Sequence, residues 1–154
     1  MLLDTSIGLW AVTDNPKLPT RARELIAEPT NDVLVSVANL WEIAIKHALA
    51  RGGVNDMPIS GPEALGYFRR AGYLLLDIAP AHAVAVEGLP QLHADPFDRM
   101  LVAQALTEPL RLLTHDLRVA RYSDTVILVG LPRKTGSRRR DGRLIFAVTR
   151  TLIG

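Results

Sequence analysis

Short apolar runs alternate along the chain with segments in which apolar residues recur at helical spacing. The apolar runs predict strands, and the periodic segments predict helices. The predicted strands span residues 1–3, 33–35, 73–78, 112–114 and 126–129, and the predicted helices span residues 18–28, 37–50, 62–71, 80–87, 96–107 and 117–122. Because strands and helices alternate, we predict an α/β fold built of βαβ units. The strands lack polar alternation, which favours a mostly parallel sheet that is covered on both faces.

The clearest helical pattern lies at residues 37–50, where apolar side chains recur at positions i, i+3, i+4 and i+7. This spacing predicts one buried face made of Val37, Leu40, Trp41, Ala44, Ile45, Ala48 and Leu49. Gly52 and Gly53 follow directly and are predicted to end the helix. Together with the helix at residues 18–28, this helix offers a surface for a second copy of the chain or for a partner protein.

The composition limits the classes of protein and site that are possible. The 154 residues favour a single domain. Cysteine is absent, which excludes both a disulfide framework and a thiolate metal site. No apolar run approaches the ~20 residues that span a bilayer, and the first residues lack the pattern of a signal peptide. We therefore expect a cytoplasmic protein with no membrane association.

Charge is distributed unevenly along the chain. Residues 133–154 hold seven basic side chains and one acidic side chain, a net charge of +6, whereas residues 1–132 hold 11 basic and 15 acidic side chains, a net charge of −4. We therefore predict a folded domain over residues 1–132 and a basic C-terminal tail over residues 133–154. Such a tail is typical of nucleic-acid contact or of a disordered, solvated end.

Four acidic residues are placed where an α/β sheet binds ligands. Asp4 directly follows the first predicted strand, and Asp116 follows the fourth. Ligands of open α/β sheets bind beyond the carboxyl ends of the strands. Asp98, in the first turn of a predicted helix, can point toward the same edge, and Glu42 borders the apolar face of another helix. We predict that these four acids converge on one site.

A cluster of four carboxylates favours one kind of chemistry. The negative charges repel one another unless a cation neutralises them. Hard oxygen ligands suit Mg²⁺ or Mn²⁺, and such an ion polarises a phosphate and activates a bound water for phosphodiester hydrolysis. The hydroxyl group of Ser6 or Thr114 can orient the water or the substrate.

Each of these acids also has a purely structural interpretation. Asp4 can cap a helix that starts near Ser6, a role that Thr5 or Ser6 could also fill. Asp116 can cap the short helix that follows it, and Asp95 can cap the helix that begins at Pro96. Asp98 then stands where a capping-box acid reaches back to the cap. Glu42 can pair with Lys46 one helical turn later. A binding module without catalytic activity, in which the acids serve as caps, therefore stays open as an alternative.

Other chemistries fit the sequence less well. A phosphatase of the haloacid-dehalogenase type places an aspartate after its first strand, as Asp4 is placed, but it needs a second aspartate where Ser6 stands here. No histidine has metal-ligand spacing to another histidine; the four are His47, His82, His93 and His115. His115 is beside Asp116 and can touch the site, but we interpret it as an exposed side chain.

Four segments of the chain carry a resemblance. They cover residues 2–6 (Leu-Leu-Asp-Thr-Ser), 36–46 (Ser-Val-Ala-Asn-Leu-Trp-Glu-Ile-Ala-Ile-Lys), 93–105 (His-Ala-Asp-Pro-Phe-Asp-Arg-Met-Leu-Val-Ala-Gln-Ala) and 113–116 (Leu-Thr-His-Asp). In order and spacing, this series resembles the PIN-domain ribonucleases, and specifically the VapC toxins of bacterial type II toxin–antitoxin systems. The match extends from residue 1 to about residue 130, and the tail beyond it resembles nothing in the family.

The resemblance implies a fold, an activity and partners. It implies a PIN-like three-layer α/β/α fold, Mg²⁺- or Mn²⁺-dependent cleavage of RNA, and inhibition by a VapB-type antitoxin that inserts a segment near the site. We also expect a homodimer. The family's metal-site acids correspond to Asp4, Glu42, Asp98 and Asp116, and the residues expected to support the site or contact the substrate are Ser6, Asn39, Asp95, Arg99 and Thr114.

Overall fold

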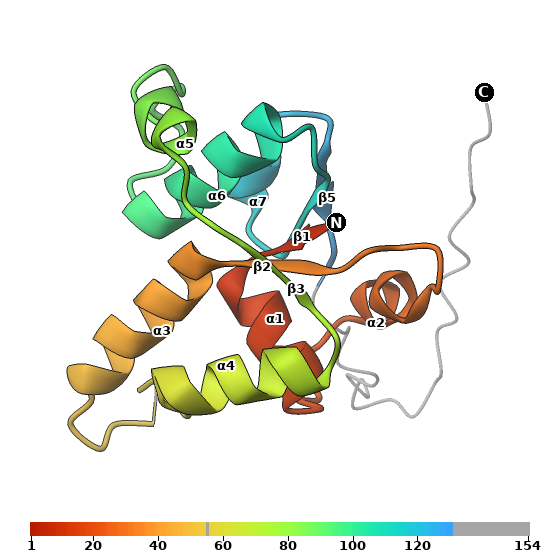
Figure 1. Ribbon diagram of the computed structural model, residues 1–154, viewed down its shortest axis with the longest axis vertical. Helices are drawn as coiled ribbons and strands as arrows, with labels where there is room; N and C mark the ends of the chain where they lie inside the picture. Colours follow the sequence, from red (N-terminus) through yellow and green to blue (C-terminus); the bar gives the residue numbers. More distant parts are fainter. Residues whose placement is uncertain (55, 131–154) are drawn as a thin grey trace, which may run out of the picture.

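The computed structural model of the chain describes residues 1–54 and 56–130 (Figure 1). The predicted domain boundary at residue 132 and the basic tail at residues 133–154 lie outside the described residues. No helix in the described part is both long enough and apolar enough to cross a membrane.

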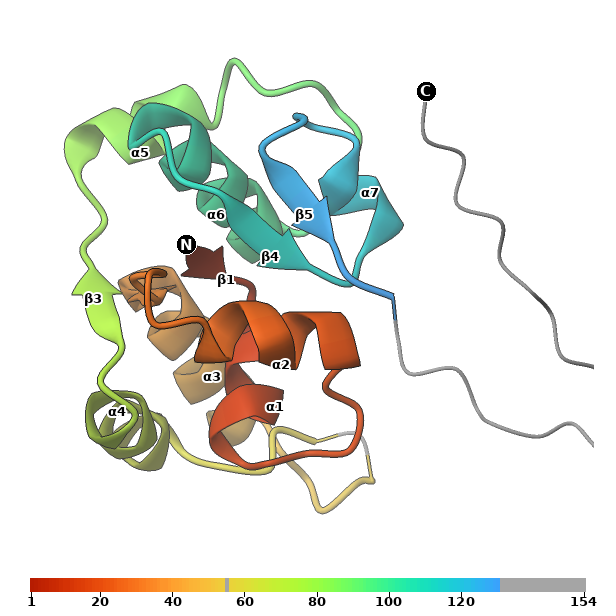
Figure 2. The same ribbon diagram turned by 90° about the vertical axis from the view of Figure 1, so that its right-hand side faces the viewer.

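A sheet of five parallel strands forms the centre of the described chain, in the order β3-β2-β1-β4-β5 (Figure 2). The strands are β1 (Leu2–Leu3), β2 (Leu34–Ser36), β3 (Leu74–Leu76), β4 (Leu112–Thr114) and β5 (Val126–Leu128). In the register of the sheet, Leu2 of the central strand lies between Leu34 and Leu112. The α/β class and the parallel sheet are therefore confirmed.

Helices cover both faces of this sheet. The helices of the described residues are α1 (Thr5–Val12), α2 (Thr20–Ala27), α3 (Val37–Ala48), α4 (Gly61–Arg70), α5 (Pro80–Ala85), α6 (Pro96–Thr107) and α7 (Leu117–Ala120). Leu3 and Leu113 belong to the apolar cluster under α1, α2 and α4. Leu2 and Leu112 belong to the opposite cluster, under α5, α6 and α7. Successive strand residues thus face opposite apolar layers, which explains why the strands show no polar alternation.

The predicted elements agree with the structure at most positions. The helix at residues 96–107 and the strand at residues 112–114 are reproduced, and the other predicted elements end within a few residues of their predicted bounds. Helix α1 is not among the predicted elements, although a helix near Ser6 was considered as one that Asp4 could cap. Its residues are apolar nearly all round, so they lack the contrast between two faces on which helix prediction rests. The carboxylate of Asp4 starts α1 by accepting the Ile7 N–H at 2.7 Å.

The prediction of the buried face of α3 is wrong. Trp41 and Leu49, both assigned to that face, are 54% and 70% exposed. The helix instead buries Ala38, Asn39, Glu42 and Ile43. The reason is its position: α3 starts at the end of β2, extends beyond the sheet, and contacts α1 and α4 on one side and α6 on the other (Figure 1). Its inward face meets the polar ends of the strands, and its apolar stripe stays on the surface.

Candidate metal centre

The four predicted acids line one small pocket at the carboxyl ends of the parallel strands. The pocket has a volume of about 160 Å³. Its lining residues are Asp4, Thr5, Ser6, Glu42, Lys46, Asp95, Asp98, His115 and Asp116. Asp4 enters from the end of β1, Asp116 from the end of β4, and the other two acids from α3 and α6. The topology of the sheet thus brings together side chains that are 112 positions apart in the sequence.

Asp4 is buried and held by protein donors on both carboxylate oxygens. Oδ1 accepts the Ile7 N–H, and Oδ2 accepts the Thr114 hydroxyl at 2.6 Å. The same Thr114 oxygen accepts the Asp116 N–H at 3.1 Å. Thr114 therefore ties the ends of the two neighbouring strands β1 and β4 together beneath the pocket.

Glu42 is buried as well and held in a similar way. Its Oε2 accepts a hydrogen bond from the Thr5 hydroxyl, and Asn39 donates to the same hydroxyl oxygen at 2.9 Å. The predicted pairing of Glu42 with Lys46 is present too, through the other carboxylate oxygen. Lys46 lies on the pocket wall, so the ion pair faces the acids and is not an isolated surface contact.

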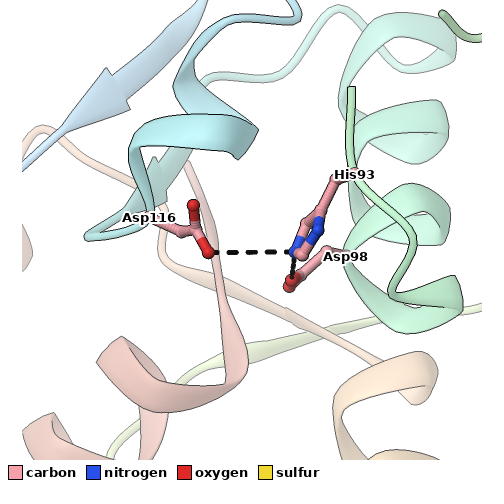
Figure 3. Close-up of side chains that lie close together, drawn as sticks. All are labelled: His93, Asp98 and Asp116. Carbon is pink, nitrogen blue, oxygen red and sulfur yellow. Dashed lines mark hydrogen bonds and ion pairs between the residues drawn. The ribbon is translucent and has the colours of Figure 1, made fainter. Parts of the chain in front are cut away.

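Asp98 lies in the first turn of α6. Asp95 caps that helix as predicted, since its carboxylate accepts the N–H groups of Phe97 and Asp98. Asp98 Oδ2 is 2.6 Å from Nε2 of His93, and the same nitrogen is 3.8 Å from Asp116 Oδ2 (Figure 3). His93 lies in the loop before α6 and was not predicted as part of the site, although it is the first residue of the segment 93–105 that carries the resemblance.

Asp116 caps α7, as its structural interpretation predicted. Its Oδ1 accepts the Arg118 N–H at 2.7 Å, and the Arg118 guanidinium lies 2.9 Å from Oδ2. Asp116 also lines the acidic pocket, so capping and participation in the cluster are compatible. Together with His93 and Asp98, it forms a group whose potential ligand atoms all lie within 4.8 Å of one another.

The family model of the PIN domain matches residues 1–124, which is most of the chain. The chain belongs to the PIN domain family. PIN domains are generally nucleases, so the acidic pocket lies in a fold that is associated with cleavage of nucleic acids. No curated protein sequence matches the chain.

A solved structure supports the PIN fold independently. The chain is similar to the structure of VapBC2 from Rickettsia felis bound to a DNA fragment from their promoter, with a TM-score of 0.60 and 17% sequence identity. The similarity covers 84% of this chain and 97% of that chain. The three-layer arrangement is therefore shared although few residues are identical.

The two acids on the α6 and α7 side of this PIN domain have pKa values shifted in opposite directions. Burial raises the pKa of Asp98 from 3.8 to about 6; the negative charges of Asp95 and Asp4 add to this, and the His93 hydrogen bond opposes it. The hydrogen bond from the Arg118 side chain lowers the pKa of Asp116 to about 2. Burial is thus the main cause of the shift at Asp98, and an ion pair is the main cause at Asp116.

His115 contacts the site, although the exposed interpretation was preferred from the sequence. Its Nδ1 is 3.5 Å from Asp4 Oδ2, and its ring lies 4.8 Å from that of Trp10. The close contact with the Asp4 carboxylate raises the pKa of the imidazole. His115 is half-buried in the pocket wall and is not the exposed side chain that its sequence position suggested.

The remaining predicted residues lie at different distances from the acids. Ser6 lines the pocket, and Asn39 and Thr114 support it from below through hydroxyl contacts. Arg99 is buried, and its guanidinium contacts backbone carbonyls in the segment before α6. It is not among the residues that line the pocket.

The donor set fits a divalent cation. Carboxylate oxygens of Asp4, Glu42, Asp98 and Asp116 are the hard ligands that Mg²⁺ and Mn²⁺ prefer. Burial first, and then the negative charges of Asp95 and Asp4, raise the pKa of Asp98, and a bound cation would favour its charged form. The residues that are present therefore match the requirement of a metal centre.

Proposed function

We propose that this PIN domain is a divalent-metal-dependent endoribonuclease and the toxin of a VapBC-type toxin–antitoxin pair. The observation that carries the proposal is the convergence of Asp4, Glu42, Asp98 and Asp116 in one pocket at the carboxyl ends of the sheet. The family assignment favours a nuclease over the phosphatase alternative.

The four acids have the role of holding Mg²⁺ or Mn²⁺ in this proposal. When bound, the cation would polarise the scissile phosphate and lower the pKa of a bound water. Thr114 and Thr5 fix the orientation of Asp4 and Glu42, so the carboxylates are arranged before the cation and the RNA arrive. Lys46 and Ser6 line the same pocket, where the ammonium and hydroxyl groups are suited to contact phosphate oxygens of the RNA.

A groove beside the acidic pocket supports an antitoxin partner. The groove has a volume of about 560 Å³ and shares Ser6 and Lys46 with the pocket. Its wall is mixed: the apolar part is formed by Leu9, Trp10, Leu49, Val54, Met57 and Pro58, and the rest is polar. A peptide of the antitoxin that packs its apolar side chains in this groove can extend a basic side chain into the acidic pocket and exclude the RNA. The similarity to the VapBC2 structure agrees with this partner.

The exposed stripe of α3 supports the expected homodimer. Trp41 and Ile45 lie one helical turn apart and are 54% and 36% exposed. Trp41 also packs edge-on against Phe97 of α6 at 5.1 Å, which extends the apolar surface across two helices. Burial of this surface by a second copy would remove it from water. Sedimentation of the wild-type chain measures the stoichiometry.

RNA cleavage with controlled metal content tests the nuclease proposal. Purified protein is expected to cut RNA internally with Mg²⁺ or Mn²⁺ and to lose this activity in excess EDTA. A saturating cation is also expected to raise the melting temperature, by about 5–10 °C at a concentration 100 times the dissociation constant. Expression in cells is expected to stop growth, and co-expression of the antitoxin is expected to relieve the arrest.

Three outcomes would contradict the proposal. Full cleavage in EDTA would exclude a metal mechanism, and a covalent aspartyl-phosphate on Asp4 would favour the phosphatase. If metal changes neither the melting temperature nor the activity, the acids serve as helix caps in a binding module.

A further inference from the structure

Arg99 organises the segment that precedes α6. The side chain is 8% exposed, and both of its terminal nitrogens donate to backbone carbonyls. Nη1 donates to Pro90 at 3.0 Å, and Nη2 donates to Val86 at 2.9 Å and to Leu89 at 3.3 Å. One buried guanidinium thereby fixes the backbone between α5 and the loop that carries His93.

Tyr122 joins His93 to this arrangement. Its hydroxyl oxygen accepts the backbone N–H of His93 at 3.1 Å and a hydrogen bond from Arg99 Nη1 at 3.2 Å. His93 itself is buried. The backbone of His93 is therefore held on one side by Arg99 of α6 and on the other by Tyr122, two residues after the end of α7, and its side chain has little freedom to move.

The contacts of the His93 ring determine which nitrogen carries the proton. Nδ1 accepts the backbone N–H of Ala94 at 3.1 Å, so its lone pair points at that group. The proton of the neutral ring is then on Nε2, which donates to Asp98 Oδ2 at 2.6 Å. To bind a metal through Nε2, the ring would have to move its proton to Nδ1, directly opposite the Ala94 N–H. The ring is therefore arranged as a donor and not as a metal ligand.

Asp98 depends on this donor more than the other acids depend on any single contact. Asp4 and Glu42 each have donors on both oxygens, and Asp116 has Arg118. Within residues 1–54 and 56–130, the only hydrogen bond that reaches the Asp98 carboxylate comes from His93. This contact occupies Oδ2 and leaves Oδ1 for a ligand in the pocket.

We propose that His93 is a positioning residue, which fixes the Asp98 carboxylate by donating Nε2–H to Oδ2 while Arg99 and Tyr122 hold its backbone. The inference rests on the proposed function, in which Asp98 binds the cation. Groups that orient metal ligands in this way change metal affinity or activity by about 10- to 100-fold when they are removed.

The test compares His93→Ala with His93→Gln. The glutamine side chain places an amide N–H where Nε2 of the imidazole lies, so it preserves a donor to Asp98, whereas alanine removes it. Calorimetric titration with Mn²⁺ is expected to show about 10- to 100-fold weaker binding for His93→Ala and a much smaller change for His93→Gln. RNA cleavage is expected to fall mainly in kcat, and circular dichroism checks that both variants are folded.

A spectroscopic measurement separates the donor role from metal ligation. Nitrogen-15 shifts of the His93 ring are expected to report a protonated Nε2 in metal-free protein and in protein saturated with Mg²⁺. Loss of that proton on addition of Mg²⁺ would overturn the proposal, because it would make His93 a ligand. Equal losses of Mn²⁺ affinity in folded His93→Ala and His93→Gln would overturn it as well.

Failure of this inference can be told apart from failure of the proposed function. If wild-type protein binds Mn²⁺ and cleaves RNA, and His93→Ala does both equally well, only the positioning role is wrong. If wild-type protein neither binds Mn²⁺ nor cleaves RNA, the proposed function is wrong, and the role of His93 falls with it.

Discussion

The two sides of the acidic pocket are built differently. On the side of β1 and α3, Asp4 and Glu42 are 5% and 7% exposed, and each accepts a hydrogen bond from a buried threonine hydroxyl. On the side of α6 and α7, the side chains of Asp98 and Asp116 are 27% and 25% exposed, and they are held by His93 and Arg118. The first pair is fixed by the central strands, whereas the second pair is fixed by side chains that reach in from loops and short helices.

The difference shows that one part of the cluster is rigid and the other part is accessible to ligands from solvent. Asp4 directly follows β1, the central strand of the sheet, where the backbone cannot shift without disturbing both apolar layers. Asp98 and Asp116 are partly exposed, so a cation and a phosphate can approach from their side. We call the side of Asp4 and Glu42 the buried side and the side of Asp98 and Asp116 the open side. Substitutions on the buried side are expected to affect stability and activity together. Substitutions on the open side are expected to affect activity with less effect on stability.

Replacement of Asp4 by alanine is expected to have the largest effect. It removes one cation ligand, the N-cap of α1 and the acceptor of the Thr114 hydroxyl. Since removing a group that merely orients a ligand costs about 10- to 100-fold, the loss of RNA cleavage should exceed about 100-fold. Asp98→Asn, on the open side, should also remove activity while changing the free energy of unfolding less. The measurements are single-turnover cleavage and urea unfolding.

Asp124→Asn is the matched control for these two variants. Asp124 is exposed and does not line the pocket, so its replacement should leave cleavage unchanged. If Asp4→Ala or Asp98→Asn keeps the activity of this control, the acids do not form the active centre. If Asp98→Asn destabilises the protein as much as Asp4→Ala does, the distinction between the two sides is wrong.

The acids on both sides of the pocket could be predicted from the sequence. Asp4 could be placed because it follows a strand, and the carboxyl ends of parallel strands share one edge of a sheet. The same reasoning placed Asp116 and identified Thr114. Asp95 could be identified as a cap from the proline that follows it.

His93 and the buried face of α3 could not be predicted, for physical reasons. The path of the loop before α6 depends on the buried contacts of Arg99 with carbonyl groups, and no periodic pattern in the sequence encodes that path. The face of α3 was mispredicted because periodicity identifies an apolar stripe without stating what covers it. Here the polar residues Asn39 and Glu42 face inward to the strand ends, and Trp41 is exposed.

Valine in place of Thr114 is expected to have an intermediate effect. The substitution keeps the shape of the buried side chain but removes the hydroxyl that donates to Asp4 and accepts from the Asp116 N–H. Loss of a buried hydrogen-bond partner should lower the free energy of unfolding by about 1–3 kcal/mol. The comparison on the open side is Arg118→Ala, which removes a solvent-exposed partner of Asp116 and should leave stability nearly unchanged. If urea unfolding shows the same loss of unfolding free energy for both variants, the contrast between the buried side and the open side is wrong.

The smallest expected effect is a difference in how the two open-side acids respond to pH. The pKa of Asp98 is about 6 in the folded chain, above its ordinary value of 3.8, so the folded state binds its proton more tightly than the unfolded state does. The stability that Asp98 contributes is therefore full below pH 3.8 and is lost as the pH rises toward about 6.

Asp116 has the opposite sign: its pKa is lowered from 3.8 to about 2, so its contribution is full above pH 3.8 and is lost as the pH falls toward about 2. Urea unfolding of metal-free protein across this range should show that Asp98→Asn flattens the decline of stability between about pH 4 and pH 6. Asp116→Asn should leave that decline in place and reduce only the loss at lower pH. The same pH slope for Asp98→Asn and wild type between about pH 4 and pH 6 would mean that burial and the neighbouring charges do not raise the pKa of Asp98.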